Sequence, residues 1–347
     1  MPEEWPVAAI LAPASAPRRS MSRDRLTTVR RDFFLDPAKR LTEQERALMS
    51  AMLHCLIGDV ADELRASLPK SWAVANDFDH QRLYETLASA GLLDDENLIG
   101  HLLRRADEEK IATMARARGE RREARVLQSL ISDENGAVAA AAMALIMARG
   151  RRRDRLGQCL LTVDDLPQPA AEWLVYAIAA AIRPDLVATR GEAAADGALA
   201  RAAAEALVRR DPARGLESLM SNLVGMFDAT GTMGDDFLLA AAGEGEIIFV
   251  AHALARRAGI EPDTAIDELI SGNIERAMGL LRMAGASRQF AASLLAIAGD
   301  FIGIVDPGAA IETFDRMNAA EIEAVRAWLH ADGRYRKAVR GLGGRSG

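Results

Sequence analysis

Residues 42–69 read TEQERALMSAMLHCLIGDVADELRASLP and contain the pattern that decides the fold. They open with a capping box, Thr42 to Glu45, in which a hydroxyl and a carboxylate satisfy free N–H groups at a helix start. Apolar residues then recur at spacings of one, three and four from Leu48 to Leu68, so they share one helix face. Pro69 cannot continue a helix. The stretch therefore predicts one long amphipathic helix.

The rest of the chain continues this helical pattern. A second apolar stripe runs from Leu166 to Ile182 and is expected to end before Pro184. Glycines that follow apolar stripes, where a helix-ending residue of positive φ is expected, are Gly91, Gly259, Gly285 and Gly333. In the second half, helices are predicted near 213–227, 236–242, 244–258, 262–271, 274–284, 287–298, 308–316 and 319–331. Their short connections force neighbouring helices into antiparallel hairpins.

The composition favours helices throughout. Half of the residues are apolar, yet only 5% are aromatic, and alanine and leucine carry most of the apolar share. Alanine costs the least to hold in a helix, and β-branched residues never form an alternating run that would predict a strand. We therefore predict an all-α fold of stacked antiparallel helical hairpins, a HEAT-like α-solenoid. An irregular helical bundle is the alternative.

A degenerate repeat favours the solenoid. An acid is followed by apolar residues five and nine positions later in three places, which are Asp59/Leu64/Leu68, Asp94/Ile99/Leu103 and Asp133/Val138/Ala142. The acids lie 35 and 39 residues apart, within the range of helix-pair repeats. In such a repeat the acid would cap the second helix, and the apolar pair would face the next repeat.

The chain divides into four expected parts. Residues 1–22 are predicted to be a disordered leader, 23–190 an N-terminal helical-repeat part, 191–332 a C-terminal helical part and 333–347 a basic flexible tail. The glycine and proline content near residue 190 marks the central seam. A single continuous stack with a bend at that point fits the sequence equally well.

Charge is distributed unevenly. A net charge of −7 argues against a general binder of nucleic acid or membrane surfaces. Residues 101–155 nevertheless hold 13 Lys and Arg against 8 Asp and Glu, whereas residues 211–331 hold 8 against 18. The sequence therefore predicts a basic region and an acidic region within one chain.

The densest basic cluster is the candidate binding site, and its guanidinium groups belong to Arg149, Arg151, Arg152, Arg153 and Arg155. At a helix junction, five guanidiniums could hold phosphates or a partner's carboxylates through paired hydrogen bonds. The alternative is a solvated helix end, where arginine meets the negative end of the preceding helix dipole.

Familiar catalytic and cofactor patterns are not found. None of the five histidines has a glutamate three residues before it or a second histidine four residues away, as helical zinc and di-iron sites require. There is no glycine–lysine phosphate loop and no dinucleotide-binding glycine motif. Cys55 and Cys159 lie in apolar helical patterns typical of buried thiols in a reducing compartment. We expect no catalytic residues, no metal and no cofactor.

The sequence also bears on location. Residues 7–16 are apolar and end in a form typical of signal-peptide cleavage, but Glu3 and Glu4 precede them where such a peptide needs basic residues. The longest unbroken apolar run, Ala137 to Ala148, is shorter than the roughly 20 residues that a membrane span needs. We expect a cytoplasmic protein with no membrane contact.

Several short motifs resemble one bacterial family. They are RDFFLDP at 31–37, LTEQERALM at 41–49, GDVADELR at 58–65, AHALARRAGI at 251–260, ISGN at 270–273 and LLRMAG at 280–285. Over roughly 30–300, the chain looks like the bacterial domain of unknown function 2336. The resemblance implies a helical, HEAT-like protein, and it offers no catalytic or ligand residues to carry over.

These features predict a non-catalytic scaffold for protein–protein interaction or regulation, which presents a helical surface to another protein. The alternative is a protein that binds nucleic acid or phosphate through the arginine-rich region 104–155. An enzyme whose site is dispersed over several helices is the third interpretation.

Overall fold

The computed structural model describes residues 41–72, 79–118 and 126–343. Those residues form α-helices and short 3₁₀ helices, and the only strand-like feature among them is one bridge between Arg153 and Cys159. The all-α prediction is therefore confirmed. The predicted leader, residues 1–22, lies outside the described residues.

The helices follow one another along the chain with short connections. Their bounds are α2 Glu43–Ser67, η3 Lys70–Trp72, α3 His80–Ser89, α4 Glu96–Arg118, α5 Val126–Ser129, η4 Leu130–Ser132, α6 Gly136–Arg151, η5 Val163–Asp165, α7 Gln168–Arg190, α8 Glu192–Arg209, η6 Pro212–Arg214, α9 Leu216–Asp228, α10 Asp235–Gly243, α11 Ile247–Ala258, α12 Pro262–Leu269, α13 Ile274–Met283, α14 Arg288–Ala298, α15 Pro307–Arg316, α16 Ala319–His330 and α17 Gly333–Gly343. The helices predicted in the second half agree with these bounds to within a few residues.

The chain forms two compact units, Met1–Ala47 and Leu48–Gly347. In the first unit, the described residues hold the predicted capping box. The Thr42 hydroxyl oxygen accepts a hydrogen bond from the Glu45 backbone N–H at 3.2 Å, and the Glu45 carboxylate accepts one from the Thr42 N–H at 2.8 Å. The helix that begins there ends at Ser67, just before Pro69, as predicted.

Apolar side chains of the second unit form two clusters. The N-terminal cluster joins α2, α3, α7 and α8, and the C-terminal cluster joins α6 and α9 to α10–α15. Helix α4 belongs to both, because its first half contributes Leu98, Leu102 and Ala106 to the N-terminal cluster. Its second half contributes Ile111 and Ala115 to the C-terminal cluster. One helix is therefore a wall of both cores.

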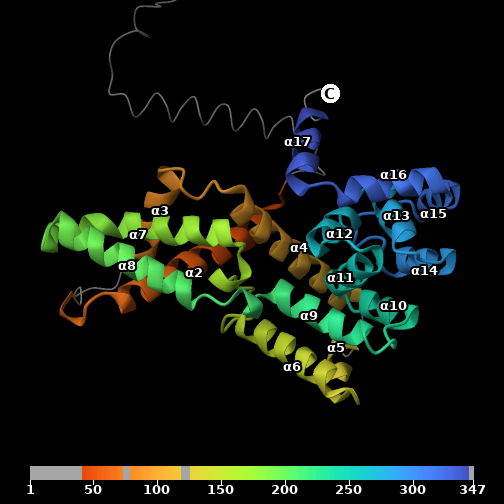
Figure 1. Ribbon diagram of the computed structural model, residues 1–347, viewed down its shortest axis with the longest axis horizontal. Helices are drawn as coiled ribbons and strands as arrows, with labels where there is room; N and C mark the ends of the chain where they lie inside the picture. The colour runs from red at the N-terminus through yellow and green to blue at the C-terminus, as the bar shows by residue number, and fades with distance from the viewer. Residues whose placement is uncertain (1–40, 73–78, 119–125, 344–347) are drawn as a thin grey trace, which may run out of the picture. The chain divides into compact units, whose positions relative to one another are not determined.

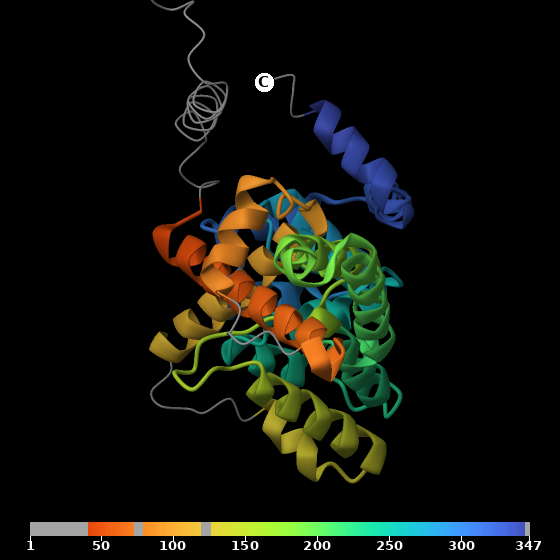
Figure 2. The same ribbon diagram turned by 90° about the vertical axis from the view of Figure 1, so that its left-hand side faces the viewer.

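Helices α7 and α8 form a hairpin that turns at Gly191, and they lie side by side in both views (Figures 1 and 2). The prediction that α7 ends before Pro184 is wrong, because the helix continues to Arg190. Proline in a helix costs roughly 3 kcal/mol. Ile182 and Leu186 flank it and are both buried, and burial of two such side chains offsets a cost of that size. The predicted seam between 190 and 191 falls in the turn of this hairpin.

Packing between helices is not a simple succession of neighbours. Helices α10, α11, α12 and α13 each pack on the next, but α6 packs on α9, α3 on α7 and α10 on α14. In a solenoid, each repeat contacts only its neighbours. The described unit therefore has features of an irregular bundle as well as of stacked hairpins.

The predicted acid-and-apolar repeat matches the burial of two of its three apolar pairs, Leu64/Leu68 and Val138/Ala142, and fails at the third. Ile99 and Leu103 are exposed, whereas their neighbours Leu98 and Leu102 are buried, so the predicted register is wrong by one residue. Asp59 lies inside α2 and not at a helix start.

Three of the four glycines predicted to end helices do so. Gly91, Gly259 and Gly285 have a φ of +69°, as predicted for helix-ending glycines. The prediction for Gly333 is wrong, because this residue begins α17.

The described part of the expected flexible tail is helical, since the Asp332 carboxylate accepts a hydrogen bond from the Arg334 N–H at 2.7 Å and so caps the helix start. Among the described helices, none has the length and apolar content that a bilayer span requires.

Candidate functional site

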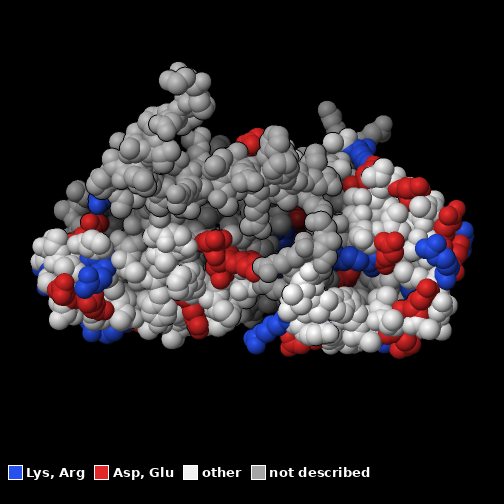
Figure 3. All heavy atoms as spheres, turned by 90° about the horizontal axis from the view of Figure 1, so that it is seen from above, with Lys and Arg blue, Asp and Glu red and all other residues white. Residues whose placement is uncertain are grey.

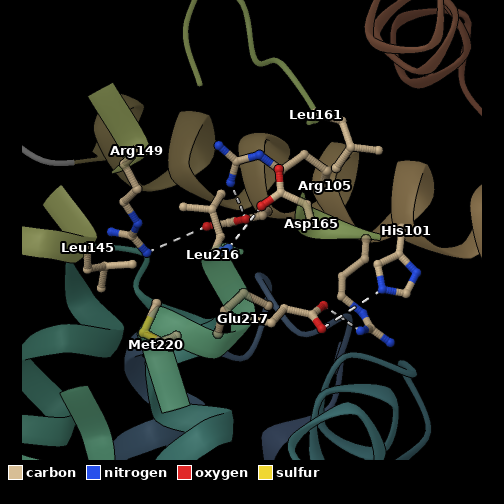
Figure 4. Close-up of a pocket in the computed structure, with 12 residues that line it drawn as sticks. His101, Arg105, Leu145, Arg149, Leu161, Asp165, Leu216, Glu217 and Met220 are labelled. Atoms are coloured by element: carbon tan, nitrogen blue, oxygen red, sulfur yellow. Dashed lines mark hydrogen bonds and ion pairs between the residues drawn. The ribbon is translucent and has the colours of Figure 1, made fainter. Parts of the chain in front are cut away.

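A pocket lies beside the middle of α4, where this helix passes from one apolar cluster to the other. Its lining residues are His101, Arg104, Arg105, Glu108, Leu145, Arg149, Leu161, Asp165, Leu216, Glu217, Met220 and Ile248. In Figure 4, Glu217 and His101 point toward each other at one end, and Arg149 reaches in at the other end beside Leu145. Charged side chains therefore converge where the two cores meet.

Helix periodicity explains why α4 presents this chemistry. His101, Arg104, Arg105 and Glu108 are spaced at intervals of one, three and four residues, which places them on one side of the helix. The same spacing buries Leu98 and Leu102 elsewhere around the helix. We call the pocket and its rim of charged residues the α4 cleft.

At one end of the α4 cleft, Arg104 is shared by three carboxylates. Its guanidinium lies 2.7 Å from Glu217, 2.8 Å from Asp263 and 3.5 Å from Asp267. Burial and the Asp263 carboxylate raise the pKa of Glu217 above its usual value, despite the ion pair with Arg104. Burial opposes the charge of Arg104, but its carboxylate neighbours outweigh burial and raise its pKa. Negative charge is therefore in excess at this end.

At the other end, Arg149 bridges two helices. Its two terminal nitrogens lie 2.7 and 2.8 Å from the two carboxylate oxygens of Glu246, and 3.5 Å separates it from Glu108. Glu108 also pairs with Arg105. Burial alone would raise the pKa of Glu108, but Arg105 and Arg149 together hold it below its usual value. The Nε atom of Arg105 is buried and has no hydrogen-bond partner.

Arg152 and Asp165 form a buried ion pair next to the α4 cleft. The Arg152 Nε lies 2.8 Å from the nearer carboxylate oxygen, and Asp165 also accepts hydrogen bonds from the backbone of Thr162 and Leu216, each at 2.9 Å. Burial would raise the pKa of Asp165, but the hydrogen bond from Arg152 leads the interactions that bring it below its usual value. Because Arg152 also donates to the Arg214 carbonyl at 2.9 Å, the pair fixes the end of α6 to the start of α9.

The five arginines predicted as an anion or partner site do not act together. Arg149, Arg152 and Arg153 bind carboxylates of this same chain, which are Glu246, Asp165 and Glu109 respectively. Arg151 and Arg155 are exposed. The sequence predicted that these arginines would bind a partner's carboxylates or a phosphate. For three of the five, the negatively charged partner is instead a carboxylate of the same chain.

Cys159 is not in a helix, contrary to the prediction from its apolar surroundings. It lies in the loop before η5, is buried, and donates a hydrogen bond from Sγ to Glu109 at 2.9 Å. Burial, reinforced by that carboxylate, raises the pKa of the thiol to about 11. Cys55 is exposed, on α2, and is therefore not a buried thiol.

Sequence reasoning missed His101, Glu217 and Asp263 as parts of a site. Arg104 lies within the predicted basic region, but its carboxylate partners are 113 and 159 residues away along the chain. The only signal in the sequence was the excess of acidic residues in 211–331, and it did not indicate which of these residues would reach Arg104.

The α4 cleft is narrow where it is most enclosed. The pocket has a volume of about 40 Å³, enough for about three water molecules. A second pocket shares His101, Asp165 and Glu217 with it and has a volume of about 280 Å³. The other residues that line the second pocket are Asp164, Leu166, Pro167, Gln168, Arg210, Pro212, Gly215, Ser218 and Asp263. The wider pocket can therefore admit a side chain that the narrow one cannot.

Neither pocket offers an arrangement for a metal. Among the described residues, no group of three or more His, Cys, Asp and Glu side chains is placed to hold a metal ion. The arginines of the α4 cleft are paired with carboxylates. The cleft is therefore a network of ion pairs and not a positively charged binding site. On the face seen in Figure 3, basic and acidic side chains of the described residues are interspersed.

The fold and the cleft define an all-α protein in which two helical cores meet at a charged cleft. The model of a family described as "Uncharacterised protein conserved in bacteria (DUF2336)" matches residues 87–327. The chain belongs to this family, as the sequence motifs predicted. The match includes the α4 cleft and extends beyond the expected C-terminal limit, whereas the three N-terminal motifs precede it. No curated protein and no solved structure matches the chain.

Proposed function

We propose that this protein is a non-catalytic interaction protein, whose α4 cleft receives a basic side chain of a partner protein. The observation that carries the proposal is the sharing of Arg104 by Glu217 and Asp263, which leaves negative charge in excess at the cleft mouth. An incoming lysine or arginine would neutralise that excess. Charge-assisted hydrogen bonds of this kind are about twice as strong as those between neutral groups.

The wider pocket supports the same proposal. Four carboxylates line it, against one arginine, Arg210, and two arginines outside the pocket, Arg152 and Arg104, pair with three of the four. Arg210 is already held by the carbonyl oxygen of Val163, at 2.8 Å, and by the side chain of Gln168, at 2.6 Å. A volume of about 280 Å³ is slightly below the roughly 300–1,000 Å³ of small-molecule sites, but it suits one long side chain.

The charge distribution along the chain agrees with this arrangement. Glu217, Asp263 and Asp267 all belong to the acidic stretch 211–331, in which 18 acidic residues stand against 8 basic ones. The surface that faces a partner would therefore come from the acidic half of the sequence.

The alternative, binding of nucleic acid or phosphate through residues 104–155, is not supported at four of the described arginines of this region, whereas Arg151 and Arg155 are exposed. Phosphate binding needs guanidiniums that are free to turn outward. Arg149, Arg152 and Arg153 are held by carboxylates of this chain, and Arg104 by three more.

HEAT-like stacking, the finer part of the fold prediction, stays a proposal. We restrict it to α10–α13, where each helix packs on the next. One helix of this stack, α12, carries Asp263 and Asp267, which lie beside Arg104.

Affinity capture from a native bacterial lysate tests the interaction, with the full chain as bait. We expect a foreign protein in near-stoichiometric amount, and purified partner should then bind with an affinity that falls as salt rises. The variant Asp263→Asn should weaken that binding about tenfold, as expected for one lost charge pair.

Asp315→Asn is the matched control, because Asp315 is also about half exposed and also pairs with one arginine, Arg288. It should bind like the wild type. Absence of any stoichiometric partner, or equal binding by the Asp263→Asn variant, would contradict the proposal. Only chains other than this protein are counted, so self-association does not affect the result.

A further inference from the structure

Helix α6 has an apolar face that no described helix covers. No ionisable residue lies between Glu134 and Arg149, so the helix is uncharged over almost its whole length. One face, which includes Val138, Leu145 and Ala148, is buried, and α6 packs on α9. The exposed residues of the helix between its flanking charges are Gly136, Ala137, Ala140, Met143, Ala144 and Met147.

This exposed face is unusual for a surface helix. Surface helices normally place polar and charged residues on the side opposite the core. Met143 and Met147 are instead 41% and 50% exposed, one helical turn apart. In both views α6 lies at an edge of the unit, with α9 on one side of it (Figures 1 and 2). A methionine and alanine face of this kind is adaptable and allows a second helix to approach closely.

Charges at the two ends of α6 indicate what that second helix is. Glu134, just before the helix, is exposed, and Arg151, its last residue, is exposed as well. Neither side chain takes part in an ion pair or hydrogen bond within the described residues. They are 17 residues apart, or about 25 Å in a helix. A second α6 that ran antiparallel would bring Glu134 of each copy to the Arg151 end of the other.

The small and large residues of the face also fit such a pairing. In an antiparallel pair centred between Met143 and Ala144, each of these residues faces the other type on the second copy. In the same register Ala140 faces Met147. Each large side chain thus meets a small one, as in well-packed helix interfaces. A parallel pair would instead place Met on Met and like charges together at both ends.

We propose that α6 is the contact face of a two-fold symmetric dimer of this protein, in which the two α6 helices pack antiparallel. The contact is isologous, so each copy contributes the same residues. In this register Glu134 lies opposite residue 153 of the other copy, two residues or about 3 Å from its Arg151, and the long arginine side chain can span that offset to form the pair at both ends. Stable interfaces bury roughly 1,200–2,000 Å² in total. One helix face is smaller than this, so the dimer dissociates in the micromolar range, about 1–100 μM.

Sedimentation velocity of the full chain between 1 and about 200 μM tests the proposal. The wild type should shift from monomer to dimer over this range. The double variant Met143→Glu with Met147→Glu should remain monomeric, with dimer association weakened by about 100-fold or more. Val305→Glu is the matched control, because Val305 is also an exposed apolar residue but lies outside α6, and it should dimerise like the wild type.

Charge reversal tests the antiparallel register. Glu134→Arg and Arg151→Glu should each weaken the dimer by about fivefold to tenfold, because each creates two like-charge contacts. The combined variant should restore dimerisation, since the opposite charges then meet again. These residues are exposed, and circular dichroism of each variant confirms that it remains folded.

A wild-type chain that is monomeric throughout the range would overturn the proposal, as would a combined charge reversal that fails to restore dimerisation. If the monomer resists oxidation of Met143 and Met147 by hydrogen peroxide, another segment of the same chain covers the face, and the proposal also fails. None of these outcomes bears on binding at the α4 cleft, because the cleft and the exposed face of α6 share no residue.

Discussion

Arg149 on α6 and Glu246 before α11 form a two-pronged ion pair, with nitrogen–oxygen distances of 2.7 and 2.8 Å. Planar guanidinium and carboxylate groups fit each other in this geometry, which lysine cannot reproduce. The pair holds α6 against the helix that forms the centre of the C-terminal cluster.

Replacement of Arg149 by methionine should destabilise the protein by about 3 kcal/mol, because it leaves the mostly buried Glu246 carboxylate without a partner. The side chain of Arg149 is 22% exposed, so we expect the lower end of the range for buried pairs. Urea unfolding measures the change. The exposed Arg155 provides the control, and Arg155→Met should alter stability by less than about 0.5 kcal/mol. Equal losses in both variants would contradict a structural role for the Arg149 pair.

His252 makes stability sensitive to acid. Burial lowers its pKa from 6.5 to about 4, and its Nε2 atom has no hydrogen-bond partner. The unfolded chain binds a proton between these values and the folded chain does not, so stability is fully present above pH 6.5. It is lost as the pH falls toward 4, by about 3 kcal/mol in total.

The variant His252→Asn lacks the titrating imidazole and therefore lacks this source of acid sensitivity. The stability difference between wild type and variant, measured by urea unfolding, should shrink by about 2.5 kcal/mol between pH 7 and pH 4.5. The exposed His330 serves as the control, and His330→Asn should leave the pH dependence of the wild type almost intact. A constant difference between wild type and His252→Asn would show that His252 is protonated equally in both states.

Gly245, between α10 and α11, needs to be glycine for two reasons. Its φ is +83°, and a Cβ atom there would lie 2.7 Å from the Cβ of Ala115 on α4. Gly245→Ala should therefore cost at least about 2 kcal/mol, from backbone strain and from displacement of α4. Gly91→Ala isolates the strain, because Gly91 has a φ of +69° and open space around it, and should cost about 1 kcal/mol. Thermal melts of both variants measure the difference, and equal shifts would mean that α4 yields without cost.

The two thiols should react at different rates. Cys159 is buried and has a pKa of about 11, whereas Cys55 is exposed. Iodoacetamide at pH 8 should modify Cys55 at least about tenfold faster, since the thiolate is the reactive form. Mass spectrometry of the native protein measures both sites, and in urea the rates should converge. Rapid loss of the Cys159 thiol in a Cys55→Ser variant would show that its loop opens readily.

Local signals in the sequence predicted much of the fold. The capping box at Thr42 and the glycines Gly91, Gly259 and Gly285 mark helix starts and ends that the structure confirms. Predictions failed where distant packing decides the outcome. Leu186 is buried against its neighbours, so α7 continues through Pro184, and no local pattern reports that burial. The register of α4 was wrong for the same reason.

The α4 cleft was much less predictable. Its basic residues were visible as a cluster in the sequence, but an arginine is satisfied by whichever carboxylate lies within reach after folding. Arg104 meets Glu217 across 113 residues, and Arg149 meets Glu246 across 97. Counts of charge along the chain gave the correct excess of acid in the second half, although they could not show that this excess would gather around one guanidinium.

Because α4 is shared by both apolar clusters, the order of synthesis has a consequence. Every residue of the N-terminal cluster lies within 49–206, so that core can close before residues 220–314 leave the ribosome. During this interval the second half of α4 would expose Ile111 and Ala115, with no core yet to receive them. The nascent chain would therefore pass through a partly folded state in which apolar residues of α4 are exposed to water. Chaperones would be expected to bind the chain at this stage.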